Sequence, residues 1–315
     1  MSRPAGDESP GPRSDDEVAV WARRLGLDGL VDLHVHFLPE RVLRKVWAYF
    51  DDAETHYGLR WPVHYRLPEP ERVAVLRKLG VRAFAPLVYP HKPDMAAWLN
   101  QWMREFVAEV PEAVLTATLY PEPSVDAYVA EALTAGARCF KAHVQVGAYD
   151  PRDEVLHRAW GLLAEAQVPV VIHCGHGPLR GEYTGVGVFE QVLRRHPRLV
   201  AVLAHAGMPE YDEAIALVER YPNVYLDTTM VGVPFTEGFM PTPPDWPSRL
   251  AGIADRVVLG TDFPNIPYPY AAQLQAVARW AEADQGLGDP FLRAVLQDTP
   301  SRLLRLVPEA TGVGG

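Results

Sequence analysis

Two histidines separated by one residue, His34 and His36, end an apolar run near the start of the chain. If that run is a β-strand, side chains two positions apart point to the same face, and both imidazoles could bind one ion. A His-x-His pair alone is weak evidence, because histidines also occur as hydrogen-bonded core residues. Its position after an apolar run that includes Asp32 strengthens the interpretation as a pair of metal ligands.

Three more polar residues end apolar runs further along the chain: His173 after VPVVI, His205 after VAVLA and Asp262 after VVLGT. Taken singly, each is more simply explained as a hydrogen-bonded core residue. Taken together, they are explained if the runs are strands whose ends surround one opening. Three histidines and one carboxylate also make a chemically sensible Zn²⁺ site. The pattern therefore predicts a metal centre.

Eight short apolar runs could be the strands that position these residues. They are nearly continuous in apolar residues, as strands buried on both faces are, and they occupy 29–37, 81–89, 113–120, 137–145, 168–174, 199–207, 223–229 and 255–263. Amphipathic segments separate or follow them, at 71–79, 94–109, 124–134, 153–166, 187–195, 210–220, 270–283 and 289–306. This α/β alternation predicts a (β/α)8 TIM barrel. An open doubly wound sheet is the alternative, but no Gly-rich phosphate loop follows the first run.

Two connections are much longer than the others. Residues 38–70 follow the first predicted strand and are rich in aromatic residues, and residues 230–254 follow the seventh and are rich in proline. Both leave the carboxyl ends of strands, where barrel active sites lie. Long loops in compact domains are usually functional, so we expect these insertions to form lids or binding walls. Structural decoration or a dimer surface is the alternative.

Length and composition are consistent with one barrel. The chain has 315 residues, 48% of them hydrophobic and 22% charged, which is ordinary for a globular protein. The first residues are polar and rich in proline, glycine, serine and acidic side chains. We therefore expect a disordered tail at 1–18, a metal-dependent (β/α)8-barrel domain at 19–307 and a flexible tail at 308–315.

Charge and motifs also limit the partners and the compartment. A net charge of -10 disfavours nucleic acid as a partner. We see no signal-peptide core and no run near the roughly 18 apolar residues of a membrane helix. Two cysteines, Cys139 and Cys174, cannot make a disulfide framework, which favours a cytoplasmic setting. We expect a small-molecule substrate, no membrane partner, and an oligomeric state for which a homodimer is the commonest precedent.

Five motifs resemble the strand-end motifs of the amidohydrolase superfamily: DLHVHFLPER, VVIHCGHGP, VLAHAGMPEY, LDTTM and VLGTDFP. They are most similar to the amidohydrolase-related (amidohydrolase 2) branch. That branch contains aminocarboxymuconate-semialdehyde decarboxylase, the resorcylate decarboxylases and many uncharacterised hydrolases. The similarity covers residues 29 to 307. It implies a (β/α)8 barrel with a divalent metal, commonly Zn²⁺, and a single metal is the rule in this branch.

Position by position, the resemblance implies roles for the polar strand ends. His34, His36, His173 and Asp262 match the ligands of one metal, and His205 matches a non-ligating base or polarising group. Asp262 would also take part in catalysis by accepting a proton from water. The segment DTPSRLLRL departs from the family's Asn-Ala-x-Arg-Leu pattern at Thr299 and Pro300, which concerns only a structural turn.

Lys141 has more than one interpretation. It lies in the fourth predicted strand, two residues before His143 and therefore on the same face. Binuclear amidohydrolases carry a carboxylated lysine on that strand, which bridges two metals, and His205 would then bind the second ion. Alternatively, Lys141 or His143 binds a substrate anion, or the two form a buried structural pair.

Several other residues on the predicted active-site face are candidates for substrate binding. For each of them a solvated loop residue is an equally simple explanation. They are Arg41, Trp47, Tyr89, His91 and His176.

The resemblance implies a hydrolase that uses metal-activated water on an amide, ester or lactone of a small molecule. The alternative is a non-oxidative decarboxylase of an aromatic or dienoic acid, which the aromatic first insertion and Arg41 would suit. A metal-binding barrel without catalysis is a third hypothesis, and a missing ligand would favour it. All four predicted ligands are present in the sequence.

Overall fold

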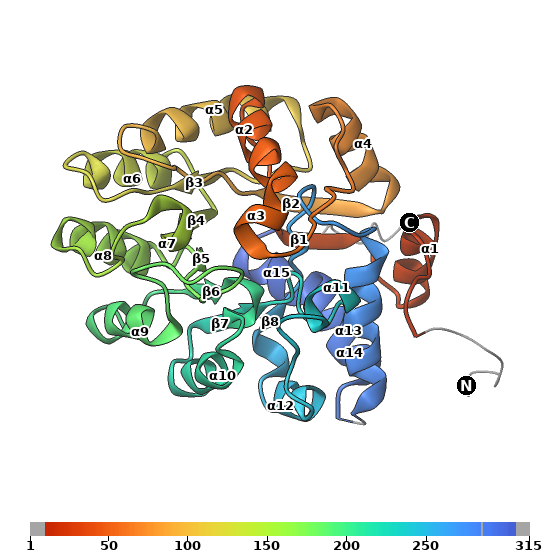
Figure 1. Cartoon of the computed structure of the whole chain (residues 1–315). Coiled ribbons are helices and arrows are strands. Elements are labelled where there is room, and N and C mark those ends of the chain that lie inside the picture. The colour runs from red at the N-terminus through yellow and green to blue at the C-terminus, as the bar shows by residue number, and fades with distance from the viewer. Residues whose placement is uncertain (1–9, 285, 307–315) are drawn as a thin grey trace, which may run out of the picture.

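Parallel strands form the centre of the fold, and helices surround them (Figure 1). The structure is a computed structural model that describes residues 10–284 and 286–306. Each of the eight predicted strands is present. They are β1 (Leu30–Val35), β2 (Val81–Pro86), β3 (Thr116–Thr118), β4 (Cys139–His143), β5 (Val170–His173), β6 (Ala201–Leu203), β7 (Val224–Asp227) and β8 (Val257–Val258).

The strands close into a barrel through two seams. Strands β1 and β2 form one hydrogen-bonded sheet, and β3 to β8 form another in sequential order. Single parallel bridges join the sheets, between Phe84 and Ala113 on one side and between Val35 and Phe263 on the other. At the first seam the backbone N–H of Val114 also donates to the carbonyl oxygen of Phe84 at 2.9 Å. The predicted (β/α)8 barrel is therefore confirmed, and the open sheet is excluded.

The predicted amphipathic segments form the outer layer of helices. These are α4 (Glu69–Lys78), α5 (Ala96–Glu109), α6 (Val125–Thr134), α8 (His157–Ala166), α9 (Val186–Arg195), α10 (Tyr211–Arg220), α13 (Ala271–Ala283) and α14 (Gly288–Arg293). The last segment, predicted as one helix over 289–306, is instead divided. A π-helical stretch, η4 (Ala294–Asp298), separates α14 from α15 (Thr299–Leu303), which begins at the Thr-Pro pair. Helix α15 lies across one end of the barrel (Figure 1).

The structure corrects the expected amino-terminal boundary of the domain. Helix α1 (Asp15–Arg24) begins three residues before the boundary expected at residue 18. Val18 is completely buried, and Asp15 accepts hydrogen bonds from the hydroxyl of Tyr65 and, at 2.9 Å, from the backbone N–H of Ala271. These contacts fix α1 to the barrel. Residues 1–9 and the expected tail at 308–315 lie outside the described residues.

A β-bulge in β1 determines where its histidines point. Asp32 pairs with Phe84 and Val35 pairs with Pro86, so β1 has one residue more than β2 over this stretch. Before the bulge, Val31 and Leu33 belong to the core cluster formed by alternate residues of the other strands. After it, the alternation shifts by one, and His34 and His36 line the cavity instead.

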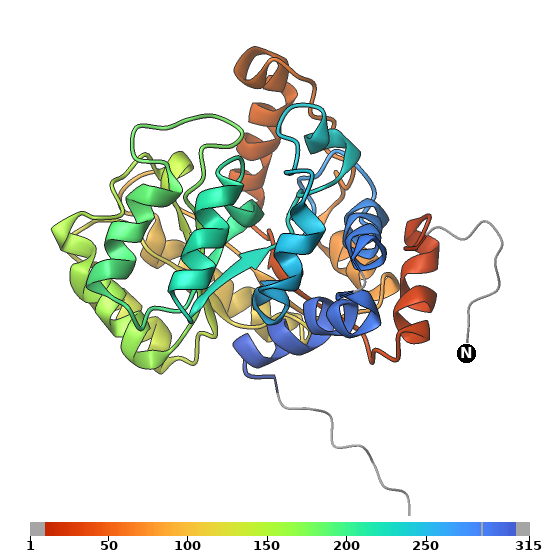
Figure 2. The same cartoon turned by 90° about the horizontal axis from the view of Figure 1, so that it is seen from below.

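The two long connections fold into helices at the same end of the barrel. The first contains α2 (Glu40–Asp51) and α3 (Ala53–Tyr57), and the second contains α11 (Pro234–Glu237) and α12 (Trp246–Ala251). Figure 2 shows α2 and α3 rising beside α11 at one end of the molecule. The indole of Trp61 packs edge-on against Phe235, with ring centroids 5.0 Å apart. The two insertions therefore contact one another.

Candidate metal centre

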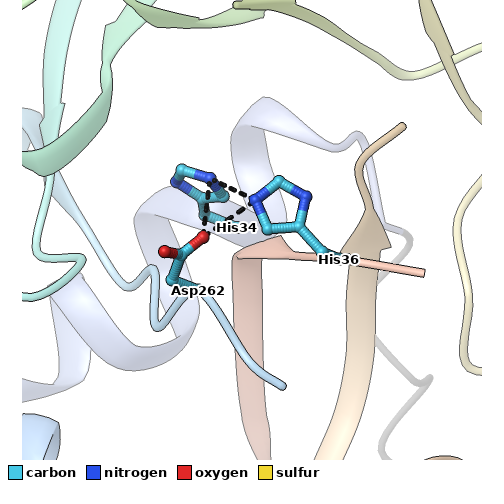
Figure 3. A group of neighbouring side chains, drawn as sticks. All are labelled: His34, His36 and Asp262. Carbon is cyan, nitrogen blue, oxygen red and sulfur yellow. Dashed lines mark hydrogen bonds and ion pairs between the residues drawn. The ribbon is translucent and has the colours of Figure 1, made fainter. Parts of the chain in front are cut away.

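Three side chains converge from β1 and from the segment after β8 (Figure 3). The Nε2 atoms of His34 and His36 are 3.2 Å apart. The Oδ1 atom of Asp262 lies 2.8 Å from Nε2 of His36 and 3.6 Å from Nε2 of His34. The three ligand atoms lie within 4.8 Å of one another, and both histidines are buried. This arrangement could hold a metal ion.

Hydrogen bonds at the far nitrogens orient both imidazoles. Nδ1 of His34 is 2.8 Å from Oδ2 of Asp227, and Nδ1 of His36 is 2.9 Å from the carbonyl oxygen of Leu87. Both partners are acceptors, so the ring protons belong on the Nδ1 atoms. The lone pairs of the two Nε2 atoms then point toward Asp262, as metal ligation requires.

The protonation states of these groups also suit a metal. Burial lowers the pKa of His34 well below its usual value, and the nearby Lys141 adds to this effect. Burial alone would raise the pKa of Asp262, but the adjacent His36 and His34 outweigh this effect. The pKa of Asp262 is therefore lowered below its usual range. Neutral imidazole and ionised carboxylate are the ligating forms, so the donor set fits a divalent cation.

Two candidate residues adopt left-handed backbone conformations. The φ angles are 55° at His205 and 64° at Asp262, values that few residues other than glycine adopt. Hydrogen bonds hold both positions. The N–H of Asp262 donates to the carbonyl oxygen of His34 at 2.8 Å, and the N–H of His205 donates to Oδ1 of Asp227 at 2.8 Å. Such conformations are found where the surrounding structure fixes a functional side chain.

His173, the fourth predicted ligand, lines the same cavity but is not part of the group of three. Its Nε2 lies 2.8 Å from the carbonyl oxygen of Gly177, and its ring stacks on His143 with centroids 4.2 Å apart. If Nε2 donates to Gly177, only Nδ1 keeps a lone pair. The role of His173 as a ligand stays a prediction.

His205 lies between the group of three and His173. Its ring centroid is 5.5 Å from that of His34 and 4.7 Å from that of His173. Nδ1 of His205 is 3.2 Å from the carbonyl oxygen of Thr229, which can only accept a hydrogen bond. Nε2 of His205 is therefore the nitrogen with a free lone pair, as a general base requires.

Lys141 lies directly against the candidate ligands. Its Nζ is 3.0 Å from Nε2 of His34, and the side chain is completely buried. Burial lowers the pKa of Lys141 to about 8, although Asp227 and Asp262 favour its charged form. Among the described residues no hydrogen bond joins Lys141 to His143, whose Nδ1 accepts from the N–H of Val146 at 3.3 Å. The role of Lys141 stays a prediction.

A cavity of about 440 Å³ opens onto this group. The residues predicted from sequence that line it are His34, His36, Tyr89, His91, Lys141, His143, His173, His205 and Asp262. Three substrate-binding candidates are not among the lining residues. Arg41 lies over the ring of Trp98, Trp47 donates to Asn265 at 3.0 Å, and His176 pairs with Glu210 at 3.2 Å. These contacts hold the three side chains outside the cavity lining.

The predicted site residues did not include much of the cavity wall, although the first insertion was expected to form a lid or binding wall. Helix α2 contributes Lys45 and Val46, and one turn later Tyr49 and Phe50. Tyr57, Trp61 and Phe239 extend the aromatic part of the wall. The spacing of the α2 residues by four could have identified this face, had the first insertion been interpreted as a helix.

Removing the charge that orients His34 should weaken metal binding. Oδ2 of Asp227 faces His34, and Oδ1 accepts from the N–H groups of His205 and Thr229. An Asp227→Asn variant must turn an amide N–H toward one of these donors. We expect metal affinity to fall roughly 10- to 100-fold, as is usual when such a partner is lost. Competition with a chelator of known affinity measures this change.

Asp255→Asn is the matched control, because the Asp255 side chain is 84% exposed and lies outside the cavity. It should keep the affinity of the unmodified protein. Equal affinities in the two variants would contradict the role given to Asp227.

The Amidohydrolase family model matches residues 31–306. This chain belongs to the amidohydrolase family. The resemblance seen in its strand-end motifs is thereby confirmed. No curated protein matches this amidohydrolase.

Solved structures resemble it at low sequence identity. An amidohydrolase from Burkholderia multivorans with bound zinc is 17% identical, with 88% of this chain and 99% of the other covered and a TM-score of 0.61. A protein named as a putative 2-pyrone-4,6-dicarboxylic acid hydrolase from Pseudomonas putida is also 17% identical (90% and 99% covered, TM-score 0.58). 5-Carboxyvanillate decarboxylase from Sphingomonas paucimobilis is 13% identical (89% and 100% covered, TM-score 0.58). At these identities the likeness shows the fold.

No helix within residues 10–284 and 286–306 of this amidohydrolase is both long and apolar enough to cross a membrane.

Proposed function

We propose that this amidohydrolase is a metal-dependent hydrolase that cleaves an amide, ester or lactone of a small molecule. The observation that carries the proposal is the convergence of His34 Nε2, His36 Nε2 and Asp262 Oδ1 within 4.8 Å beside a cavity of about 440 Å³. Neutral nitrogen and anionic oxygen donors at the mouth of a barrel suit metal-assisted attack by water.

One zinc ion is the proposed cofactor. His34, His36 and Asp262 would hold it, with His173 as the fourth proposed ligand. Mixed imidazole and carboxylate donors suit Zn²⁺, and the neighbour from Burkholderia multivorans contains zinc. When bound, zinc supplies a Lewis acid that polarises carbonyl groups and lowers the pKa of water.

Asp262 and His205 are proposed to move the protons. The carboxylate of Asp262 has a second oxygen, which can accept a proton from the attacking water and pass it to the leaving group. His205 has its free Nε2 lone pair in the cavity, where it can act as general base or, once protonated, polarise the substrate carbonyl. Asp227 positions a proposed metal ligand and the proposed base, because it contacts the ring of His34 and the backbone of His205.

Lys45 is proposed to bind an anionic group of the substrate. It lines the cavity, and among the described residues no ion pair involves it. A Lys45→Met variant should weaken binding of benzoate up to about tenfold, because a charged hydrogen bond at an exposed site is lost. The neutral analogue benzamide should bind both proteins equally. Inhibition constants for the two compounds measure the effect, with the exposed Lys92→Met as control.

A non-oxidative decarboxylase is the second candidate function. The aromatic wall of Tyr49, Phe50, Tyr57 and Trp61 suits a planar acid, and Lys45 could hold its carboxylate. One structural neighbour is a decarboxylase of 5-carboxyvanillate. The same residues would then position an acid for loss of carbon dioxide instead of activating water.

Two measurements test these proposals. Elemental analysis should find about one zinc per chain in the unmodified protein and less in His173→Ala. A second metal that is lost in Lys141→Met would instead make Lys141 and His205 ligands, and no metal would contradict the proposal. The metal-loaded protein is then incubated with small lactones, esters, amides and aromatic acids. Hydrolysis products support the first function, and carbon dioxide release supports the second.

A further inference from the structure

A second cavity lies in the outer layer, between the start of α8 and the end of α9. Its volume is about 110 Å³, and none of its lining residues lines the first cavity. Helices α8 and α9 are neighbours in the outer ring (Figure 1), and a side-chain contact joins them there. The cavity is therefore separate from the candidate metal centre.

Two imidazoles face each other in this cavity. His157 is the first residue of α8, and His196 directly follows α9. Nδ1 of His157 and Nε2 of His196 are 2.9 Å apart, with ring planes inclined by 48°. Trp160 also lines the cavity and is fixed by its Nε1–H, which donates to the carbonyl oxygen of Pro151 at 2.9 Å. The two histidines thus come from different elements and meet beside the fixed indole of Trp160.

The charged groups around the cavity are compatible with a bound cation. Arg152 binds both oxygens of Asp150 at 2.8 Å, and Arg195 binds both oxygens of Glu154 at 2.6 and 3.1 Å. The two guanidinium groups are thereby neutralised. Asp153, a further lining residue, adds a negative charge that no described arginine or lysine pairs with.

We propose that His157 and His196 bind a divalent transition-metal ion, such as Zn²⁺, Ni²⁺ or Cu²⁺. Bonds of about 2.1 Å at a tetrahedral angle place two ligand nitrogens about 3.4 Å apart, so the two imidazoles, 2.9 Å apart, would separate by about 0.5 Å on binding the ion. Imidazole donors select these ions over Mg²⁺ and Ca²⁺, which prefer oxygen. Water would complete the coordination. The bound ion would link α8 to α9 and stabilise the folded chain.

Equilibrium dialysis against Zn²⁺ tests the site in the full-length, metal-loaded protein. The unmodified protein should bind one ion per chain more than either His157→Ala or His196→Ala. His157 is exposed, so its replacement should leave the fold intact. His64→Ala, which removes an exposed histidine outside both cavities, is the matched control and should bind as many ions as the unmodified protein.

Thermal unfolding provides a second readout that does not depend on activity. Added Zn²⁺ should raise the Tm of the unmodified protein and of His64→Ala more than that of either variant, whereas Mg²⁺ should have the same effect on all four. Equal zinc binding in all four proteins, or loss of the ion in only one of the two cavity variants, would overturn the proposal. Because the readout is a difference between variants, it stands whether or not the proposed catalytic metal is present.

Discussion

A His36→Ala variant should lose its bound metal and roughly a thousandfold or more in kcat/KM. Nε2 of His36 contacts Oδ1 of Asp262 at 2.8 Å and Nε2 of His34 at 3.2 Å, so its removal takes away a central donor. A catalytic metal contributes several kcal/mol to the transition state, and each 1.36 kcal/mol corresponds to about a tenfold change in rate. Elemental analysis and steady-state kinetics measure both effects.

The His64→Ala variant is again a suitable control, because it removes an exposed histidine outside the cavity. Metal content and activity should both be unchanged in this variant. If His36→Ala retains its metal and its activity, the centre formed by His34, His36 and Asp262 is not the catalytic one.

A His205→Asn variant should keep its metal but lose about 10²- to 10⁴-fold in kcat, the usual contribution of a general acid–base group. Asparagine is chosen because it tolerates the left-handed conformation at this position, where φ is 55°. A loss of activity in this variant can therefore be assigned to the missing base and not to strain in the backbone. The Nε2 lone pair that faces the cavity is removed, while the groups that bind the metal remain.

Two comparisons make this result interpretable. Ala206 also has a positive φ, of 49°, so Ala206→Gly relaxes the same turn without removing the base and should remain close to full activity. Metal content of His205→Asn is measured alongside kcat. Loss of the metal in that variant would mean that His205 is a ligand, and the single-metal assignment would be wrong.

The sequence predicted the barrel well because strong local signals specify it. Short, β-branched apolar runs such as VPVVI and VAVLA are typical of strands buried on both faces, and the amphipathic segments between them bury one side. The polar residues that end these runs were also informative. His34, His36 and Asp262 lie together because carboxyl ends of parallel strands meet at one end of a barrel.

Contacts between distant segments were not predictable in the same way. The bulge in β1 arises from its pairing with β2, and His173 turns toward Gly177 in a loop that sequence periodicity does not describe. Trp47 was expected in the cavity, but it instead donates to Asn265, while Lys45 two residues earlier faces inward. A helix places such close neighbours on different sides, and the first insertion carried no clear helical signal.

Separate parts of the chain, the strand ends and the two insertions, supply the reactive groups and the cavity wall of this site. The proposed ligands and proton-transferring groups come from the carboxyl ends of β1 and β5 and from the segments after β6 and β8, whereas α2, α3 and the segment around Phe239 supply the aromatic wall and Lys45. Surface segments accept insertions and replacements more readily than barrel strands do. A new substrate range could thus be acquired by exchanging residues 38–70 and 230–254, while the reactive centre is inherited unchanged.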